Sequence, residues 1–330
     1  MNLRRGSQYT GKIPAYCPTS MVSHRPVAKK TSMHKNPSFI FPLSDRGTYS
    51  ELNVLVLGRL YAETINADFF IDDRKWAASP GVGLAEFFEA EISRWTNHSP
   101  HITAFRHSLR SRLATATFNI FSGQATLPAA IAFDEFMSAK FWKKSLGFGD
   151  EKMVNQWLFN EKKHFFDEFY RFNANTRSRI NVINSRFSLQ EPYCAAHVRR
   201  GDKITSKEMQ AISLEAYAAA IAKQPQKKAL IFSDDFRIFE ELRDLTKAKN
   251  ATIQLINCID ETTTGFSEKH YRKIPNEERI EMVTRVFAEM ELMRRAHSLV
   301  CTFSSNVSRF AALYVGIENC LSLDCDWHPY

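Results

Sequence analysis

Three short stretches of the 330-residue chain place charged or hydroxyl side chains directly after an apolar run. They are HVRRGDK at residues 197–203, SDD at residues 233–235 and CTFSSN at residues 301–306. Arginine side chains bind phosphate oxygens in a fork, and the N–H groups at the start of a helix favour the same kind of anion. The residue types in the first and third stretches therefore indicate a site for a phosphate-bearing ligand.

Each stretch also has a purely structural interpretation. The arginine-rich turn is compatible with a surface cluster of salt bridges, and Ser304 and Ser305 are typical of residues that cap a helix. Asp234 and Asp235 are compatible with a divalent metal site or with capping of the helix that follows. Arg-Gly-Asp at residues 200–202 is also an adhesion sequence, but its position after a strand argues against that use.

The pattern around these stretches predicts alternating strands and helices. Strands are predicted at residues 193–198, 229–233, 251–256 and 299–303, and helices at residues 214–223, 236–247, 276–296 and 306–316. Such alternation is typical of a parallel sheet with helices on both faces. In open parallel sheets, ligands bind beyond the carboxyl ends of the strands. If the strands are neighbours, we expect the three stretches to meet at one edge.

The chain is long enough for two domains of ordinary size. Residues 1–38 have no hydrophobic period and are predicted to form a loose arm. Residues 39–190 are predicted to form an N-terminal α/β domain with a helical segment, and residues 191–330 a C-terminal Rossmann-like domain. Within the N-terminal domain, the pattern predicts helices at residues 51–65, 83–95 and over most of 140–187, and a strand at residues 68–72.

The composition limits the possible partners and compartments. The formal net charge of +8 favours anionic partners, but no Lys/Arg-rich block with interleaved aromatic residues is present, so nucleic acid is not expected. No apolar run is long enough to span a membrane, and the N-terminus lacks the apolar core of a signal peptide. We therefore expect a cytoplasmic protein, or one of the Golgi or secretory lumen if an anchor or signal belongs to the whole protein.

Several familiar motifs are absent from the sequence. It contains no GxGxxG, GxxxxGK[ST], GxSxG or HExxH, which argues against dinucleotide, Walker-type, serine-hydrolase and zincin sites. The six cysteines form no CxxC pair and have no zinc-ligand spacing, although a Cys320–Cys325 disulfide is conceivable. Arginine together with a helix N-terminus remains as the route to anion binding.

HVRRGDK, SDD and LVCTFSSNVSR at residues 299–309, in this order and spacing, resemble the motifs of α1,6-fucosyltransferases. That family includes the enzymes of core N-glycans and of chitin oligosaccharides, and is more distantly related to protein O-fucosyltransferases. Weaker similarity begins near residue 45 and ends near residue 316. The resemblance implies a GT-B-like α/β fold with two Rossmann-like halves and parallel sheets. It also implies GDP-fucose as donor, an oligosaccharide or glycoprotein acceptor, inversion at the sugar carbon, and no metal or other cofactor.

The resemblance also implies roles for individual residues. Arg199 is expected to hold the β-phosphate and stabilise the charge that grows as GDP leaves. His197 and Glu289 are expected to contact guanine. The complete set expected around the donor is His197, Arg199, Arg200, Asp234, Asp235, Glu289, Ser304, Ser305 and Tyr49.

A base must remove the proton of the acceptor hydroxyl, and the resemblance implies a glutamate shortly after Lys203. Counting forward from the arginine motif reaches Lys207, whereas counting back from Glu215 reaches Glu208 with a one-residue insertion. We take Glu208 as the base, with Lys203 tuning it electrostatically, and Asp202 as the substitute candidate.

Two departures from the family pattern leave the acceptor open. Tyr49 and Glu51 stand where family members have a glycine-rich loop with a glutamine, so Tyr49 is expected to stack on the donor or bond to it. Gly201 makes the arginine motif similar to that of the protein O-fucosyltransferases. The alternatives to an α1,6-type enzyme are therefore a protein O-fucosyltransferase and a catalytically inactive protein that binds a GDP-sugar or a glycan.

Overall fold

The computed structural model describes residues 37–89, 101–105, 130–187, 189, 191–205, 209–249, 252–259, 265, 267–271 and 273–330. Contacts divide the chain into Met1–Lys35 and the compact unit Asn36–Tyr330, which holds every element named below. The arm predicted for residues 1–38 therefore lies outside the described residues except at its end. The division of the remainder near residue 190 stays a prediction. None of the described helices has the length and apolar composition of a membrane span.

The first sheet contains four parallel strands in the order β2-β1-β3-β4. They are β1 (Ser38–Pro42), β2 (Asp68–Asp72), β3 (His101–Phe105) and β4 (Ala130–Ala132). Helix α1 (Thr48–Thr64) connects β1 to β2, and most of its side chains are buried. The predicted helix at residues 51–65 and strand at residues 68–72 are thus confirmed. β1 gave no strand signal because its residues are almost all buried, which removes the alternation that marks a half-buried strand.

A run of helices follows the first sheet: α3 (Phe133–Phe136), α4 (Ala139–Leu146), α5 (Glu151–Phe169) and α6 (Ala174–Asn184). Local sequence explains where the last three begin. The side chains of Ser138, Asp150 and Asn173 each accept a backbone N–H at the start of the helix that follows. Gly147 ends α4 with φ of 70°, a conformation that favours glycine. The helical segment predicted over residues 140–187 is confirmed.

The helix predicted at residues 83–95 is wrong in its described part. A short 3₁₀ helix, η1 (Gly83–Glu86), forms instead, and Phe88 then pairs with the chain after α5 in an isolated antiparallel bridge. The Asp73 carboxylate accepts the Leu84 N–H at 2.8 Å and fixes this turn. Phe88 enters an aromatic core, so tertiary packing overrides the helical pattern of the sequence.

The second sheet contains five parallel strands in the order β7-β6-β5-β8-β9. They are β5 (Cys194–Val198), β6 (Lys228–Ser233), β7 (Gln254–Asn257), β8 (Ser298–Cys301) and β9 (Cys320–Ser322). The first four correspond to the predicted strands. β9 was not predicted, because three residues are too few to establish a period.

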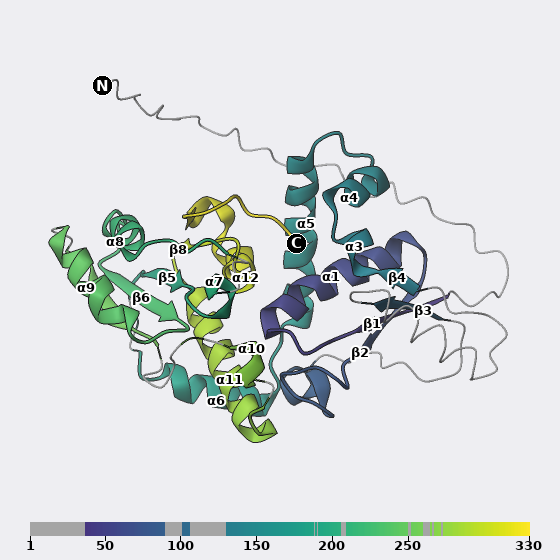
Figure 1. Ribbon diagram of the computed structural model, residues 1–330, viewed down its shortest axis with the longest axis horizontal. Helices are drawn as coiled ribbons and strands as arrows, with labels where there is room; N and C mark the ends of the chain where they lie inside the picture. Colours follow the sequence, from purple (N-terminus) through teal and green to yellow (C-terminus); the bar gives the residue numbers. More distant parts are fainter. Residues whose placement is uncertain are drawn as a thin grey trace. The chain divides into compact units, whose positions relative to one another are not determined.

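Helices cover both faces of the second sheet (Figure 1). They are α7 (Asp202–Thr205), α8 (Leu214–Ala222), α9 (Ile238–Ala248), α10 (Glu268–Tyr271), α11 (Asn276–Met293), α12 (Asn306–Val315) and the 3₁₀ turn η2 (Ile317–Asn319). In β5, Ala196 and Val198 join the apolar cluster of α8 and α9, whereas Ala195 joins that of α11 and α12. This alternation confirms the predicted parallel sheet with helices on both faces.

The apolar cluster on the α11 and α12 side continues into α1, α5 and the first sheet. Aromatic rings form its centre, with Phe166 and Phe310 4.6 Å apart and Phe87 and Phe287 5.2 Å apart between ring centroids. Polar contacts also cross it, since the Asn53 side chain of α1 donates to the Asn306 carbonyl of α12 at 3.0 Å. The first turn of α12 is therefore held from both parts of the fold.

The cysteines described by the structure are all free thiols: Cys194, Cys258, Cys301, Cys320 and Cys325. The Cys320–Cys325 disulfide that the spacing allowed is thus not formed, and Cys17 lies outside the described residues.

Candidate functional site

The three polar stretches HVRRGDK, SDD and CTFSSN meet at one edge of the second sheet. β5 pairs with β6 on one side and with β8 on the other, and both pairings are parallel. Val198, the last residue of β5, lies opposite Ser233, the last residue of β6. The carboxyl ends of the strands therefore point the same way, and the arrangement expected from the sequence is confirmed.

Asp234 holds the arginine turn in place. Its carboxylate accepts the backbone N–H groups of Arg200 and Gly201, each at 2.7 Å, and forms an ion pair with the Arg199 guanidinium at 2.7 Å. The Arg200 guanidinium donates to the Ile212 carbonyl at 2.8 Å. The side chains of Arg199 and Asp234 are only 14% and 11% exposed, so this ion pair is largely shielded from water. Asp234 therefore stabilises the arginine turn. The sequence had suggested that it contacts the sugar-nucleotide donor, and that contact stays a prediction.

Asp235 faces the helix that follows β6. Its carboxylate accepts the Arg237 N–H at 3.1 Å and pairs with the Arg237 guanidinium at 2.6 Å. The hydrogen bonds from Arg237 lower the pKa of Asp235. The helix-start interpretation of Asp235 therefore matches its contacts. Among the residues that the structure describes, no group of three or more His, Cys, Asp and Glu side chains could hold a metal ion.

A carboxylate that the sequence did not single out occupies the turn after β8. Asp324 accepts the N–H groups of Phe303 and Ser304 at 2.8 and 3.2 Å, and the Ser304 hydroxyl also donates to it. The Ser322 hydroxyl donates to the same carboxylate at 2.9 Å. Burial raises the pKa of Asp324, but these hydrogen bonds outweigh burial and lower it overall. Because Ser304 gives both of its donors to Asp324, it has none left for a phosphate oxygen in this arrangement.

In the third stretch, the Ser305 hydroxyl and the N–H groups at the start of α12 are the candidate donors to a phosphate. Ser305 is the N-cap residue, is 3% exposed, and makes no capping bond with its side chain. Arg309 fixes the next residue by donating to the Asn306 side chain at 2.7 Å. The first-turn N–H groups and the helix dipole provide positive potential beside the arginine turn. Together with Arg199 they form a suitable place for a phosphate.

His197 lies at the end of β5 and contacts α12. Its Nδ1 atom is 2.8 Å from the hydroxyl of Ser308, and only 7% of the residue is exposed. Burial and the nearby Arg199 guanidinium lower the pKa of His197 to about 4, while the Asp234 carboxylate opposes them. The imidazole is therefore neutral at physiological pH, so it acts as a hydrogen-bond partner and not as a cation. Sequence reasoning missed Ser308, which lies within the third motif but after its obvious hydroxyl pair.

Glu289 on α11 belongs to the same neighbourhood. Burial raises the pKa of Glu289 to about 8, the charges of Arg285 and Arg186 oppose this rise, and the Asp234 carboxylate adds to it. Asp234, which holds the arginine turn, is thus among the charges that act on Glu289. By surface exposure Glu289 is only partly buried, and a carboxyl with a raised pKa is a common property of binding sites.

We expect Glu289→Gln to change the pH dependence of stability. A native pKa of about 8, against 4.5 for an ordinary Glu, means that the native state binds the proton more tightly. The wild type therefore loses stability as pH rises from 4.5 to about 8, and the glutamine variant lacks this loss. Above about pH 8 the variant should be more stable by roughly 1–3 kcal/mol, with no gain below about pH 4.5.

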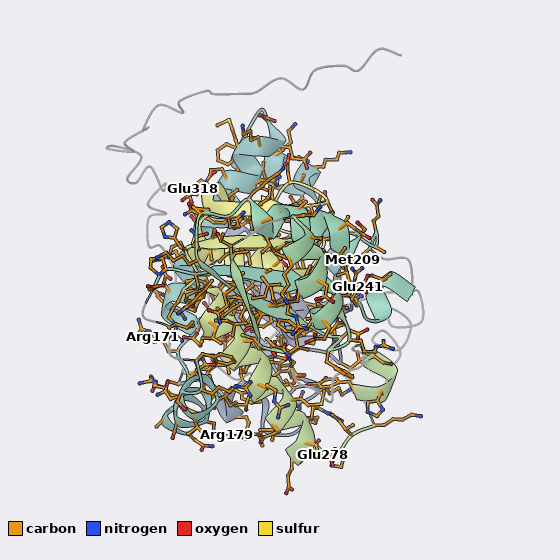
Figure 2. The ribbon with its side chains drawn as sticks, turned by 90° about the vertical axis from the view of Figure 1, so that its left-hand side faces the viewer. Arg171, Arg179, Met209, Glu241, Glu278 and Glu318 are labelled. Carbon is orange, nitrogen blue, oxygen red and sulfur yellow. The ribbon has the colours of Figure 1, made fainter. Side chains whose placement is uncertain are left out.

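Urea unfolding at about pH 5 and about pH 9 would measure this effect. Glu278→Gln is the matched control, since Glu278 lies exposed near the start of the same helix (Figure 2). An equal difference between wild type and Glu289→Gln at both pH values would contradict the prediction.

Tyr49 is not at this edge as the sequence suggested. It lies in the first turn of α1, is 2% exposed, and shares a 2.6 Å hydrogen bond between hydroxyls with Tyr170. Its ring packs on Phe310 with 4.7 Å between centroids. Burial in the aromatic core gives this side chain a packing role, because an aromatic residue fits a core position as readily as a ligand contact.

The expected base, Glu208, lies outside the described residues, so its role stays a prediction. The chain resumes at Met209, labelled in Figure 2, whose N–H donates to the Lys203 carbonyl at 3.0 Å. Asp202 begins the short helix α7. The described backbone at Met209 is thus tied to the short helix that follows the arginine turn.

Comparison with solved structures assigns the fold to a class. The chain is similar to a NodZ α1,6-fucosyltransferase soaked with GDP-fucose, with TM-score 0.50, 15% identity, and coverage of 84% of this chain and 93% of that one. It is also similar to POFUT1 in complex with GDP, with TM-score 0.50, 10% identity, and coverage of 87% and 98%. NodZ from Bradyrhizobium follows at TM-score 0.49 and 14% identity, covering 85% and 93%. The chain thus has the GT-B-like α/β fold of the first two structures.

Comparison by sequence finds no such relative. The chain matches no protein-family profile, and no curated protein matches its sequence. The likeness to the solved structures is therefore one of fold.

Proposed function

We propose that this protein is an inverting glycosyltransferase that transfers fucose from GDP-fucose to an oligosaccharide, with α1,6-type specificity. One observation supports this proposal most: the parallel pairing of β5, β6 and β8 brings Arg199, Ser305 and the start of α12 to one sheet edge. A guanidinium and a helix N-terminus facing the same space suit a diphosphate leaving group. The fold shared with a NodZ structure soaked with GDP-fucose makes this donor the preferred candidate.

In the proposed site, Arg199 and the start of α12 bind different oxygens of the diphosphate. A guanidinium has five N–H donors, so Arg199 can contact Asp234 and a phosphate together. The Ser305 hydroxyl and the first-turn N–H groups of α12 hold the remaining phosphate oxygens. Arg200 keeps the turn rigid through its bond to the Ile212 carbonyl. Asp234 supports the arginine turn and Asp235 the start of α9, and whether either also contacts the donor stays a prediction.

The base of the nucleotide lies between His197 and Glu289 in this proposal. Both residues are coupled electrostatically to Asp234, which supports a common location. The ionised Glu289 carboxylate accepts N–H groups of guanine, and the neutral His197 ring contacts the same base. Since burial raises the pKa of Glu289 to about 8, the N–H donors of guanine must stabilise the carboxylate for Glu289 to ionise at neutral pH.

Transfer requires no covalent intermediate in this scheme. The acceptor hydroxyl attacks the anomeric carbon from the face opposite GDP, its proton passes to Glu208, and the bond to the β-phosphate oxygen breaks. Arg199 stabilises the negative charge that GDP gains, and it does so without a metal ion. Lys203, in the short helix α7, precedes Glu208 by five residues in the sequence, and its positive charge is proposed to favour the ionised form of this base.

A second candidate, protein O-fucosyltransferase, shares the donor half of this mechanism. The Arg-Arg-Gly-Asp turn and the similarity in fold to POFUT1 favour it. An inactive GDP-sugar-binding protein is the third candidate, because Ser304 and Tyr49 are engaged inside the protein. The kind of acceptor distinguishes the first two candidates, and the absence of turnover distinguishes the third.

A transfer assay tests the proposed activity. Purified protein would be incubated with GDP-fucose and, separately, chitin oligosaccharides, N-glycans and folded protein domains, with GDP release and product mass as readouts. We expect an acceptor-dependent fucosylated oligosaccharide, and a loss of about 100-fold or more in turnover for Glu208→Gln. Transfer to folded domains alone would favour the second candidate, and GDP-fucose binding without transfer to any acceptor would favour the third.

A further inference from the structure

Ser308 and His197 form a buried contact between α12 and β5. The Ser308 side chain is 0% exposed, and its hydroxyl oxygen lies 2.8 Å from His197 Nδ1. Neither residue can exchange this contact for water without opening the packing between the helix and the strand. The contact therefore fixes the orientation of the imidazole ring.

The contact also determines which ring nitrogen carries the proton. Within the described part of the chain, the hydrogen bond of the Ser308 hydroxyl is to His197. The Cys301 thiol is a second polar neighbour of this hydroxyl, and sulfur is a weak acceptor. A buried hydroxyl donates to the best acceptor within reach, because an unpaired O–H is costly. Ser308 thus donates to Nδ1, and the proton of the neutral ring lies on Nε2.

The surroundings of His197 agree with a neutral ring. The Arg199 guanidinium disfavours a second positive charge beside it, and the Asp234 carboxylate is already engaged with Arg199 and the backbone of the arginine turn. Cys301 stays protonated because burial raises the pKa of its thiol, so no thiolate attracts a proton to this group. The hydrogen bond therefore joins two neutral side chains, with the Ser308 hydroxyl as donor and His197 Nδ1 as acceptor.

We propose that Ser308 is a positioning residue that sets the tautomer of His197, and that the resulting Nε2–H selects a purine with an exocyclic oxygen over one with an exocyclic amine. This inference rests on the proposed donor site. Guanine presents an acceptor, O6, at position 6, whereas adenine presents an amine donor there. N7 is an acceptor in both bases, so the proposed selectivity depends on a contact of Nε2–H with position 6. An Nε2–H donor therefore complements guanine and opposes the adenine amine, while the Glu289 carboxylate accepts the N–H groups that guanine alone presents beside O6.

Nitrogen NMR tests the tautomer without any nucleotide. The ¹⁵N shifts of His197, assigned by comparison with His197→Gln, should show protonated Nε2 and unprotonated Nδ1 in the wild type. Ser308→Ala should lose this pure pattern, and Ser308→Thr, which keeps the hydroxyl, should retain it. A wild-type ring protonated at Nδ1 would overturn the inference.

Calorimetric titration of GDP and ADP tests the consequence for selectivity. We expect the ratio of GDP to ADP affinity to fall about tenfold in Ser308→Ala and to recover in Ser308→Thr. Thr246→Ala is the control, because it removes a buried helical hydroxyl that bonds to the Leu242 carbonyl in α9. Should Ser308→Thr fold poorly in this packed position, Ser308→Cys, a weaker donor of similar size, should give an intermediate ratio.

The outcomes separate this inference from the proposed function. Tight GDP binding by the wild type with an unchanged ratio in Ser308→Ala overturns the role of Ser308 and leaves the donor site intact. A parallel loss of GDP and ADP binding in Ser308→Ala also overturns it, since a purely structural role predicts that result. Absence of GDP binding by the folded wild type overturns the proposed donor site and the selectivity that rests on it.

Discussion

Arg199→Ala is expected to reduce GDP affinity by about 100-fold, equivalent to about 3 kcal/mol. The variant loses a charge-assisted contact to the diphosphate. It also leaves the Asp234 carboxylate without its 2.7 Å ion pair, which adds a repulsive charge beside the phosphates. Transfer should fall further than binding, because Arg199 stabilises charge that grows only as GDP leaves.

Arg199→Lys and Arg237→Ala make this prediction specific. Lysine keeps the charge but lacks the planar fork, so we expect an intermediate loss of affinity. Arg237 pairs with the neighbouring Asp235, and its side chain is 64% exposed, so its removal should leave GDP binding unchanged. Calorimetry on the three variants measures the series. Wild-type affinity in Arg199→Ala would contradict the assignment of the phosphate site.

Phe287→Ala should destabilise the protein by about 3–5 kcal/mol. Phe287 on α11 is 0% exposed, and its ring lies within 5.1 to 6.2 Å, between centroids, of five others. These rings are Tyr49, Phe87, Phe88, Tyr170 and Phe172. Removing a ring at this point leaves a cavity that its aromatic neighbours cannot easily fill. Urea unfolding followed by tryptophan fluorescence would measure the loss.

Met282→Ala is the matched control on the same helix. Met282 is 40% exposed, so its truncation should change stability by less than about 0.5 kcal/mol. Because Glu289 lies just beyond Phe287 on α11, the Phe287 variant should also bind GDP more weakly. A loss of stability below about 1 kcal/mol for Phe287→Ala would show that the aromatic cluster does not hold α11 in place.

The sequence allowed the elements of the second sheet to be predicted well. Fully apolar runs such as ALIFS stood between clear helical periods, and each ended in a polar turn. The parallel arrangement followed from that alternation, and with it the meeting of three polar turns at one edge. Two strands were not predicted. β1 lacks the alternation that marks a half-buried strand, and β9 is only three residues long.

The contacts of the candidate site residues were harder to predict than the turns that carry them. Arg199 and His197 lie close together after β5, and the carboxylate of Asp234, which bonds to the arginine turn, comes from a distant position in the sequence. Asp324 follows Ser304 by 20 residues, and no local pattern relates the two. Tyr49 was misjudged because burial depends on packing between α1, α11 and α12, which the sequence does not reveal. Pairings across the fold are where sequence patterns carry least information.

Direct titration of GDP into the folded wild-type chain tests the central claim that a nucleoside diphosphate-sugar donor binds at the carboxyl edge of β5, β6 and β8. The titration would be run with a chelator present, and repeated with GDP-fucose and GDP-mannose. Our account predicts binding of one GDP per chain that survives the chelator and is lost in Arg199→Ala. Absence of GDP binding, or binding that Arg199→Ala leaves intact, would contradict it.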